Sequence, residues 1–187
     1  MSESAEALAA NLKSRRNVTI EINNISNAHC LIDPKIYMDS GHCHIPPQPT
    51  VIPMKTELCN FTKTSAKASG AVGLLSYDLL EKSSNRVTDR LVLMFSVPYD
   101  NSMYKNWFGL AIYGTDKEVN EKLFKEMYYN KEQQGFLRAE ASGSGLTFQG
   151  RCLDVMATMS PLGRSIMKVE IWDKLFNPPM SQGMNCL

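Results

Sequence analysis

The chain has 187 residues, of which 43% are hydrophobic, and this is enough for one domain with a sizeable core. Its 20 lysines and arginines nearly balance 19 aspartates and glutamates, which argues against a nucleic-acid-binding protein because such proteins carry a strong basic excess. No run approaches the ~18 consecutive apolar residues of a membrane-spanning helix, and the first residues lack the apolar core of an export signal. We therefore expect a soluble protein without a classical export signal.

Residues 2–16 are rich in helix formers, and Leu8 and Leu12 are four residues apart, so they predict a short amphipathic helix. The basic cluster at 13–16, KSRR, stands where cations stabilise the C-terminal end of a helix. An attraction to anionic lipid is the alternative interpretation of this cluster.

Alternating or apolar segments bounded by turn residues predict many short strands after this helix. They are expected at 18–22, 30–37, 55–63, 71–80, 86–97, 110–113, 135–141, 146–149, 153–160 and 164–172. The sequence TDKE at 115–118 has the form of a capping box that opens a second helix, along which Val119, Leu123 and Met127 recur every four residues.

Many short strands and only two helices predict a mainly β fold, a single β-sandwich flanked by two α-helices. We divide the chain into an N-terminal helix over 1–16, a sandwich over 17–176 and a disordered tail over 177–187. The segment from Met94 to Tyr113 then places Tyr99, Tyr104, Trp107 and Phe108 in one loop between two strands. Such rings form either a small satellite core or a surface that receives a cation or a lipid interface.

The five cysteines are odd in number and irregular in spacing, which favours free thiols in a reducing compartment. Sequons occur at Asn17, Asn24 and Asn60, and we expect them to be unused in a chain without an export signal. All three histidines lie between residues 29 and 44, but their spacing matches no familiar zinc pattern, so we expect no metal site.

Several motifs together resemble the actinoporins, the pore-forming cytolysins of sea anemones. They are YMDSG at 37–41, KASGAVG at 67–73, FSVPYD at 95–100, then Tyr104, Asn106 and Trp107, MYY at 127–129 and the closing segment 161–172. The resemblance covers about residues 5–174. The five cysteines, the insertion around 42–50 and the tail after Trp172 are more similar to the actinoporin-like proteins found outside the anemones.

The resemblance implies a phosphocholine headgroup, typically from sphingomyelin, held between the aromatic loop and the second helix. It assigns headgroup binding to Ser40, Val72, Ser96, Pro98, Tyr104, Phe124, Tyr128 and Tyr129. It assigns contact with the membrane interface to Tyr99, Met103, Trp107 and Phe108, and the apolar face of a pore helix to Leu8 and Leu12.

The chain also departs from the family pattern. Phe124 and Asn101 stand where the family has tyrosines, Met103 where it has a tryptophan, and Asp39 where anemone members have an arginine. These departures keep the cage of rings that would surround the headgroup, which is formed by Tyr104, Tyr128 and Tyr129. They weaken the anchoring of the protein at the membrane interface.

A quaternary ammonium is recognised by aromatic faces, each of which contributes roughly 0.5–2 kcal/mol. Three tyrosines give a few kcal/mol, and ~4 kcal/mol corresponds to about millimolar affinity, so useful binding needs several lipids, inserted rings or oligomerisation. The residues before the first strand would form a helix of about 22 Å, short of the ~30 Å hydrocarbon core. The N-terminal segment therefore either crosses a thinned bilayer, with 18–22 unravelled into the helix, or stays packed on the sandwich.

We predict a cytolysin-like protein that binds choline-headgroup membranes, forms homo-oligomers there and opens cation-permeable pores. It would reach its target membrane by a non-classical export route, the alternative being a cytoplasmic location. A lectin-like module and a lipid-binding module without a pore are the alternative functions. No nucleophile, base and orienting group can be assembled, so we expect neither an enzyme nor a cofactor, and no nucleic-acid partner.

Overall fold

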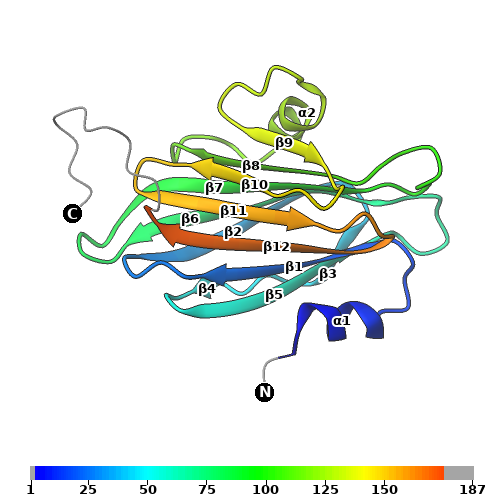
Figure 1. The fold of residues 1–187 in the computed structure, drawn as a ribbon, viewed down its shortest axis with the longest axis horizontal. Helices are drawn as coiled ribbons and strands as arrows, with labels where there is room; N and C mark the ends of the chain where they lie inside the picture. The colour runs from blue at the N-terminus through cyan, green and yellow to red at the C-terminus, as the bar shows by residue number, and fades with distance from the viewer. Residues whose placement is uncertain (1–2, 175–187) are drawn as a thin grey trace.

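A computed structural model describes residues 3–174, in which two six-stranded sheets pack as a β-sandwich with one helix on each side (Figure 1). Sheet A runs in the order β10 (Leu146–Gln149), β11 (Leu153–Met159), β12 (Arg164–Asp173), β1 (Asn17–Asn24), β5 (Lys55–Thr62) and β3 (His42–Ile45). Sheet B runs in the order β4 (Thr50–Val51), β2 (His29–Ser40), β6 (Ala71–Glu81), β7 (Arg86–Val97), β8 (Trp107–Tyr113) and β9 (Leu137–Glu140). The helices are α1 (Ala5–Asn11) and α2 (Glu121–Tyr129).

The predicted fold class is confirmed, and the strand predictions fall within a few residues of the observed strands. The division at residue 16 stays a prediction, and the tail expected at 177–187 lies outside the described residues.

The inner faces of the two sheets form the main core, where the rings of Phe61 in β5 and Phe95 in β7 stack with centroids 4.7 Å apart. Alternate residues of β7 belong to this core, as the period of two in a strand requires.

Helix α2 covers the outer face of sheet B through Leu123, Phe124 and Met127, all of which are buried. A side chain at Gly109 of β8 would place its Cβ 2.9 Å from the backbone of the neighbouring β9 and 3.6 Å from the methyl group of Met127. Glycine at this position therefore allows the helix to lie close to the sheet. Strand β6 is buried on both faces over residues 71–79, which explains why apolar side chains dominate this segment without alternating.

The start of α2 differs from the prediction. Asn120, not Thr115, is the N-cap residue, and its side chain accepts a hydrogen bond from the Leu123 amide at 3.1 Å. The preceding segment is not helical because Arg90 of β7 donates a hydrogen bond to the Lys117 carbonyl. Arg90 also forms a buried ion pair with Asp78, so the position of this segment is fixed by sheet B rather than by a capping box.

Helix α1 is shorter than the predicted helix over 2–16. Ser4 caps its first turn, Leu8 is buried against β1 and β12, and the helix ends at Asn11 with Leu12 already extended. Seven residues give a length of about 10 Å. The expectation that the basic cluster at 13–16 caps the helix is therefore wrong, because these residues lie beyond its last turn. Neither helix of the described chain is long and apolar enough to cross a bilayer.

The three sequon asparagines have structural roles. Asn17, Asn24 and Asn60 are fully buried, and each side-chain amide donates a hydrogen bond to a backbone carbonyl. A glycan at any of them is therefore incompatible with this fold.

The prediction of five free thiols is partly wrong. Cys30, Cys43 and Cys59 are free, whereas Cys152 is disulfide-bonded. Complete burial raises the pKa of the Cys59 thiol far above its ordinary value, so this thiol stays protonated and unreactive.

Acid should loosen α1 from sheet A. The Lys168 ammonium donates a hydrogen bond to the Glu6 carboxylate at 2.6 Å, and this contact holds the pKa of Glu6 below its ordinary value of 4.5. Because the pKa is lowered, the Glu6–Lys168 contact is present at neutral pH and is lost as the pH falls through the lowered pKa of Glu6. Amide heteronuclear NOE values in α1 are expected to drop as the pH is lowered from neutral through the lowered pKa of Glu6, before strand amides change. Glu6→Gln should show the low values already at neutral pH, and an unchanged profile in this variant would contradict the assignment.

Candidate functional site

One row of residues crosses the outer face of sheet B near the C-terminal end of β7. Ser40 pairs with Val72, Val72 with Ser96, Ser96 with Trp107, and Trp107 with Glu140, so five strands each contribute one member. Directly paired residues of antiparallel strands point to the same side of the sheet. Three of the predicted headgroup residues, Ser40, Val72 and Ser96, are thus brought together although they are far apart in the sequence.

Ser96 is the unusual member of this row. It is fully buried, and its hydroxyl has no hydrogen-bond partner in the described part of the chain. Leaving such a group unpaired costs roughly 1–3 kcal/mol, so a buried hydroxyl of this kind requires an explanation.

Pro98 follows at the end of β7, where the backbone lies close to that of β6. A Cβ at Gly70 would stand 2.2 Å from the Val97 carbonyl oxygen and 3.0 Å from the Pro98 Cα. The glycine of the KASGAVG motif therefore permits this close approach and positions the base of the predicted site.

A chain of four rings extends from sheet B along α2. Tyr37 of β2 contacts Phe124 at a centroid distance of 5.8 Å, Phe124 stacks on Tyr128 at 5.3 Å, and Tyr128 meets Tyr129 edge to face at 4.8 Å. Exposure of the rings increases along α2, from Phe124 at 1% through Tyr128 to Tyr129 at 66%. Phe124 is part of the support beneath the tyrosines, and it offers a ligand no accessible ring face.

Arg138 of β9 places its guanidinium over the Trp107 ring, 4.3 Å from the centroid. Its Nε is buried and has no hydrogen-bond partner among residues 3–174. Burial lowers the pKa of the guanidinium, while the nearby Tyr128 acts in the opposite direction. A cation in this state is favourably placed to receive an anion, because burial has removed part of its hydration.

The loop between β7 and β8, residues 98–106, carries the exposed side chains Tyr99, Met103 and Tyr104. Tyr104 lines a cavity of about 260 Å³ together with Glu140 and Pro161, on the side of the β11–β12 turn. The structure describes no ring contact between Tyr104 and the tyrosines of α2. The predicted cage therefore consists of two separate parts in this structure.

Phe108 is misassigned by the sequence analysis. It is fully buried between the two sheets, whereas its neighbour Trp107 is half-buried on the outer face. Both residues belong to β8, so their side chains point to opposite faces, and only Trp107 faces α2. Phe108 is a core residue and is removed from the proposed membrane surface. The expected apolar face of a pore helix is also smaller than predicted, since Leu12 lies outside α1.

Sequence reasoning missed Tyr37 and Arg138 as members of this site. Tyr37 stands in the YMDSG motif, so its position was visible, but its contact with α2 depends on the packing of the helix over β2. No local sequence pattern pointed to Arg138, because its position over Trp107 follows from the pairing of β8 with β9. Leu162, 63% exposed in the β11–β12 turn, was also missed, and Asn106 joins this turn to the aromatic loop by two hydrogen bonds.

His42 and His44 share the exposed face of β3, as expected from their spacing. His29 is buried at the start of β2, and burial lowers the pKa of its imidazole. In residues 3–174 no three histidine, cysteine, aspartate or glutamate side chains are grouped as metal ligands.

Comparisons with known proteins agree with this architecture. DELTA-alicitoxin-Pse1b of Phyllodiscus semoni is 43% identical over 63 residues, which are 34% of this chain and 25% of the toxin. Cytolysin tenebrosin-B of Actinia tenebrosa is 27% identical over 108 residues, which are 56% of this chain and 44% of the cytolysin. The matched regions thus span less than half the length of these curated relatives.

The solved structure of the lipid binding protein Nakanori is similar to this fold, with a TM-score of 0.64, 12% identity, and coverage of 90% of this chain and 77% of Nakanori. The sequence model of the family described as sea anemone cytotoxic protein matches residues 5–172, including both helices and every strand up to most of β12. This chain therefore belongs to the sea anemone cytotoxic protein family, the actinoporins.

Proposed function

We propose that this chain binds membranes whose lipids carry phosphocholine headgroups, at the outer face of sheet B beside the C-terminal end of α2. The observation that carries the proposal is the pair of unpartnered polar groups beside Trp107, the Ser96 hydroxyl and the Arg138 Nε. A site with a buried hydroxyl and a buried guanidinium Nε that lack partners in the described chain is suited to receive an anionic oxygen.

The two halves of the headgroup need different partners. The trimethylammonium has no N–H to donate, so it is received by the faces of Tyr128 and Tyr129, with Tyr104 closing from the loop. The phosphate accepts hydrogen bonds from Ser96 and Arg138, and Ser40 stands two strands away in the same row. The adjacent positions of rings and donors match a zwitterion better than they match a sugar, which would need several directional acceptors.

One headgroup provides only weak binding, so membrane association requires further contacts. The loop residues Tyr99 and Met103 and the turn residue Leu162 are exposed by 51%, 72% and 63%. Their insertion at the interface, together with Tyr104 and Trp107, adds apolar contact at the same end of the sandwich. Homo-oligomerisation on the membrane would multiply the number of headgroups bound by each assembly.

Perforation is the second step of the proposal, and the fold limits how it happens. Strand β1 lies in the middle of sheet A, paired with β12 and β5 along its whole length, and Val18, Ile20 and Ile22 are buried. Removing it would break both ladders and expose side chains worth about 1.5–3 kcal/mol each. Any pore segment therefore ends before Asn17. Lipid binding without a pore is the second candidate function, because α1 has only seven residues and its buried Leu8 holds it on sheet A.

The test is co-sedimentation with sphingomyelin-containing vesicles, combined with dye release from the same vesicles. Binding with release supports the cytolysin, and binding without release supports the second candidate. Absence of binding would overturn the proposed function, and a glycan array would then test a lectin-like activity.

Ser96 should serve binding at the expense of stability. Ser96→Ala removes an unpaired buried hydroxyl, so the melting temperature is expected to stay equal or rise. Vesicle binding should fall severalfold in the same variant. Ser76 is the matched control, because it is also buried on this face with an unpartnered hydroxyl but pairs with Val92, away from the row. Ser76→Ala should leave vesicle binding unchanged, and equal behaviour of both variants would contradict the assignment.

Arg138 should distinguish phosphocholine from choline. A hydrogen bond to a charged group is worth about 1.5–3 kcal/mol, so Arg138→Met should weaken phosphocholine binding about tenfold or more. Choline has no phosphate, so its affinity should not change. NMR titration of the Trp107 indole resonance with each ligand measures both values, and a similar loss for both ligands would show that Arg138 only supports the ring.

A further inference from the structure

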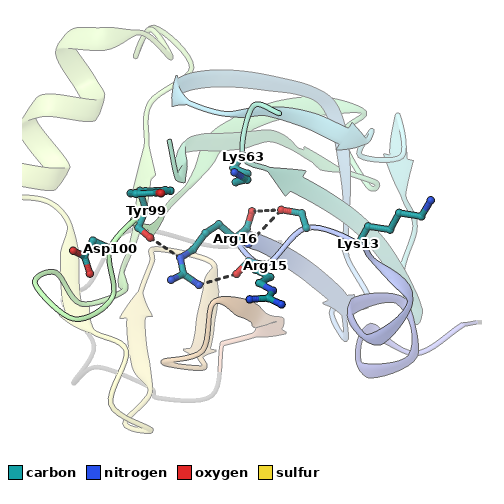
Figure 2. A pocket seen from close by; sticks show the side chains of 7 residues that line it. Lys13, Arg15, Arg16, Lys63, Tyr99 and Asp100 are labelled. Carbon is teal, nitrogen blue, oxygen red and sulfur yellow. Dashed lines mark hydrogen bonds between the residues drawn. The ribbon is translucent and has the colours of Figure 1, made fainter. Parts of the chain in front are cut away.

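A groove of about 500 Å³ lies between the segment after α1 and the aromatic loop. Lys13, Arg15 and Arg16 come from the first segment, Lys63 from the end of β5, and Tyr99 and Asp100 from the loop (Figure 2). Arg16 fixes this arrangement, because its Nε donates a hydrogen bond to the Tyr99 carbonyl oxygen at 2.7 Å.

The groove has an excess of positive charge that the described chain does not neutralise. No ion pair joins any of its four cations to a carboxylate within residues 3–174. By contrast, Lys168 of β12 and Lys174, just after that strand, are both paired. Asp100 is the one acidic residue of the lining. Its oxygen accepts hydrogen bonds from Ser102, which lowers its pKa, so it stays ionised and leaves a net positive groove.

Two of these cations also border a neighbouring groove. A second groove of about 540 Å³ shares Lys13, Ser14 and Lys63 with the first, and His42 and His44 line its far side. The first groove is bounded by the half-exposed ring of Tyr99, over which the Lys63 ammonium lies at 5.9 Å. Cations and an exposed ring side by side are the composition of a surface that docks on an anionic bilayer.

The cations do not converge on one point. In Figure 2 the Lys13 side chain extends away from the groove, and the Arg15 and Arg16 guanidinium groups point in different directions. A compact cage for one phosphate ion needs donors directed at a common centre, whereas a charged lipid surface only needs cations spread over one face.

We propose that the basic face formed by Lys13, Arg15, Arg16 and Lys63 binds the phosphate groups of anionic phospholipids. This contact would give the protein a preference for membranes that contain such lipids. The inference rests on the proposed function, since it adds a second class of lipid at the same end of the sandwich. The Ser96 hydroxyl, the Arg138 guanidinium and the aromatic rings beside α2 are not required for this second contact, so the two contacts are separable.

The experiment compares sphingomyelin/phosphatidylcholine vesicles with and without phosphatidylserine, using the full chain. The variant Lys13→Gln/Arg15→Gln/Lys63→Gln removes three cations and keeps Arg16, which holds the loop. The control Lys55→Gln/Lys82→Gln/Arg86→Gln removes the same charge at the opposite end of the sandwich, where β5 begins and the β6–β7 turn lies. Melting temperatures of all three proteins verify that they are folded.

Phosphatidylserine should strengthen binding of the unaltered chain and of the control variant, and 0.5 M NaCl should remove this gain. Each cation near an anionic bilayer contributes about fivefold, so the groove variant should lose on the order of 100-fold on phosphatidylserine vesicles. On vesicles without phosphatidylserine all three proteins should bind equally.

Equal binding to both vesicle types by the unaltered chain would overturn this inference and leave the proposed function intact. Failure to bind choline-lipid vesicles at all would instead count against the proposed function. Competition by inorganic phosphate beyond that of chloride at equal ionic strength would show a compact phosphate site, and would also overturn the proposal of a bilayer surface.

Discussion

The packing of α2 on the outer face of sheet B is the interaction on which the site depends. Leu123, Phe124 and Met127 bury the helix against the sheet, and Gly109 removes the side chain that would hold it away. The same packing brings Tyr128 and Trp107 against one cluster, and Trp107 pairs with Ser96, whose hydroxyl is buried. Because the helix has only nine residues and little stability of its own in water, its position is determined by these contacts.

Two different physical mechanisms would attract this protein to a membrane. The row beside α2 combines rings with a partly dehydrated guanidinium, and its interactions act over a few ångströms in a protected place. The basic face beside α1 carries exposed cations whose attraction extends over a Debye length and weakens with salt. The first mechanism selects a headgroup, and the second raises the rate at which the protein meets a charged surface.

The sequence allowed most of the strands and their approximate ends to be predicted, because apolar segments such as 71–80 and 86–97 are bounded by turn residues. The short strands β3 and β4 were not among these predictions. It did not determine which of two adjacent aromatic residues faces the core, since Trp107 and Phe108 exchange faces if the strand begins one residue later. Arg138 reached the site through strand pairing that spans about thirty residues of sequence, and no local pattern reports such pairing. The basic cluster at 13–16 was assigned to a helix end because helix propensity continues past Asn11. In the structure the Ser14 hydroxyl donates to the Arg16 carbonyl and the Asn17 amide donates to the Ser14 carbonyl, and these hydrogen bonds favour an extended path.

The hydrogen bond from Arg16 to the loop uses the backbone carbonyl of residue 99 rather than the tyrosine side chain. The bond therefore does not depend on which amino acid occupies that position. The exposed side chains of the loop, and with them the lipid preference, can differ among related proteins. The hydrogen bond between the loop and the segment that follows α1 does not depend on them. The loop is therefore held in place through a main-chain atom, the Tyr99 carbonyl, whereas the surface offered to lipids is formed by side chains. The side chains can change without loss of this hydrogen bond.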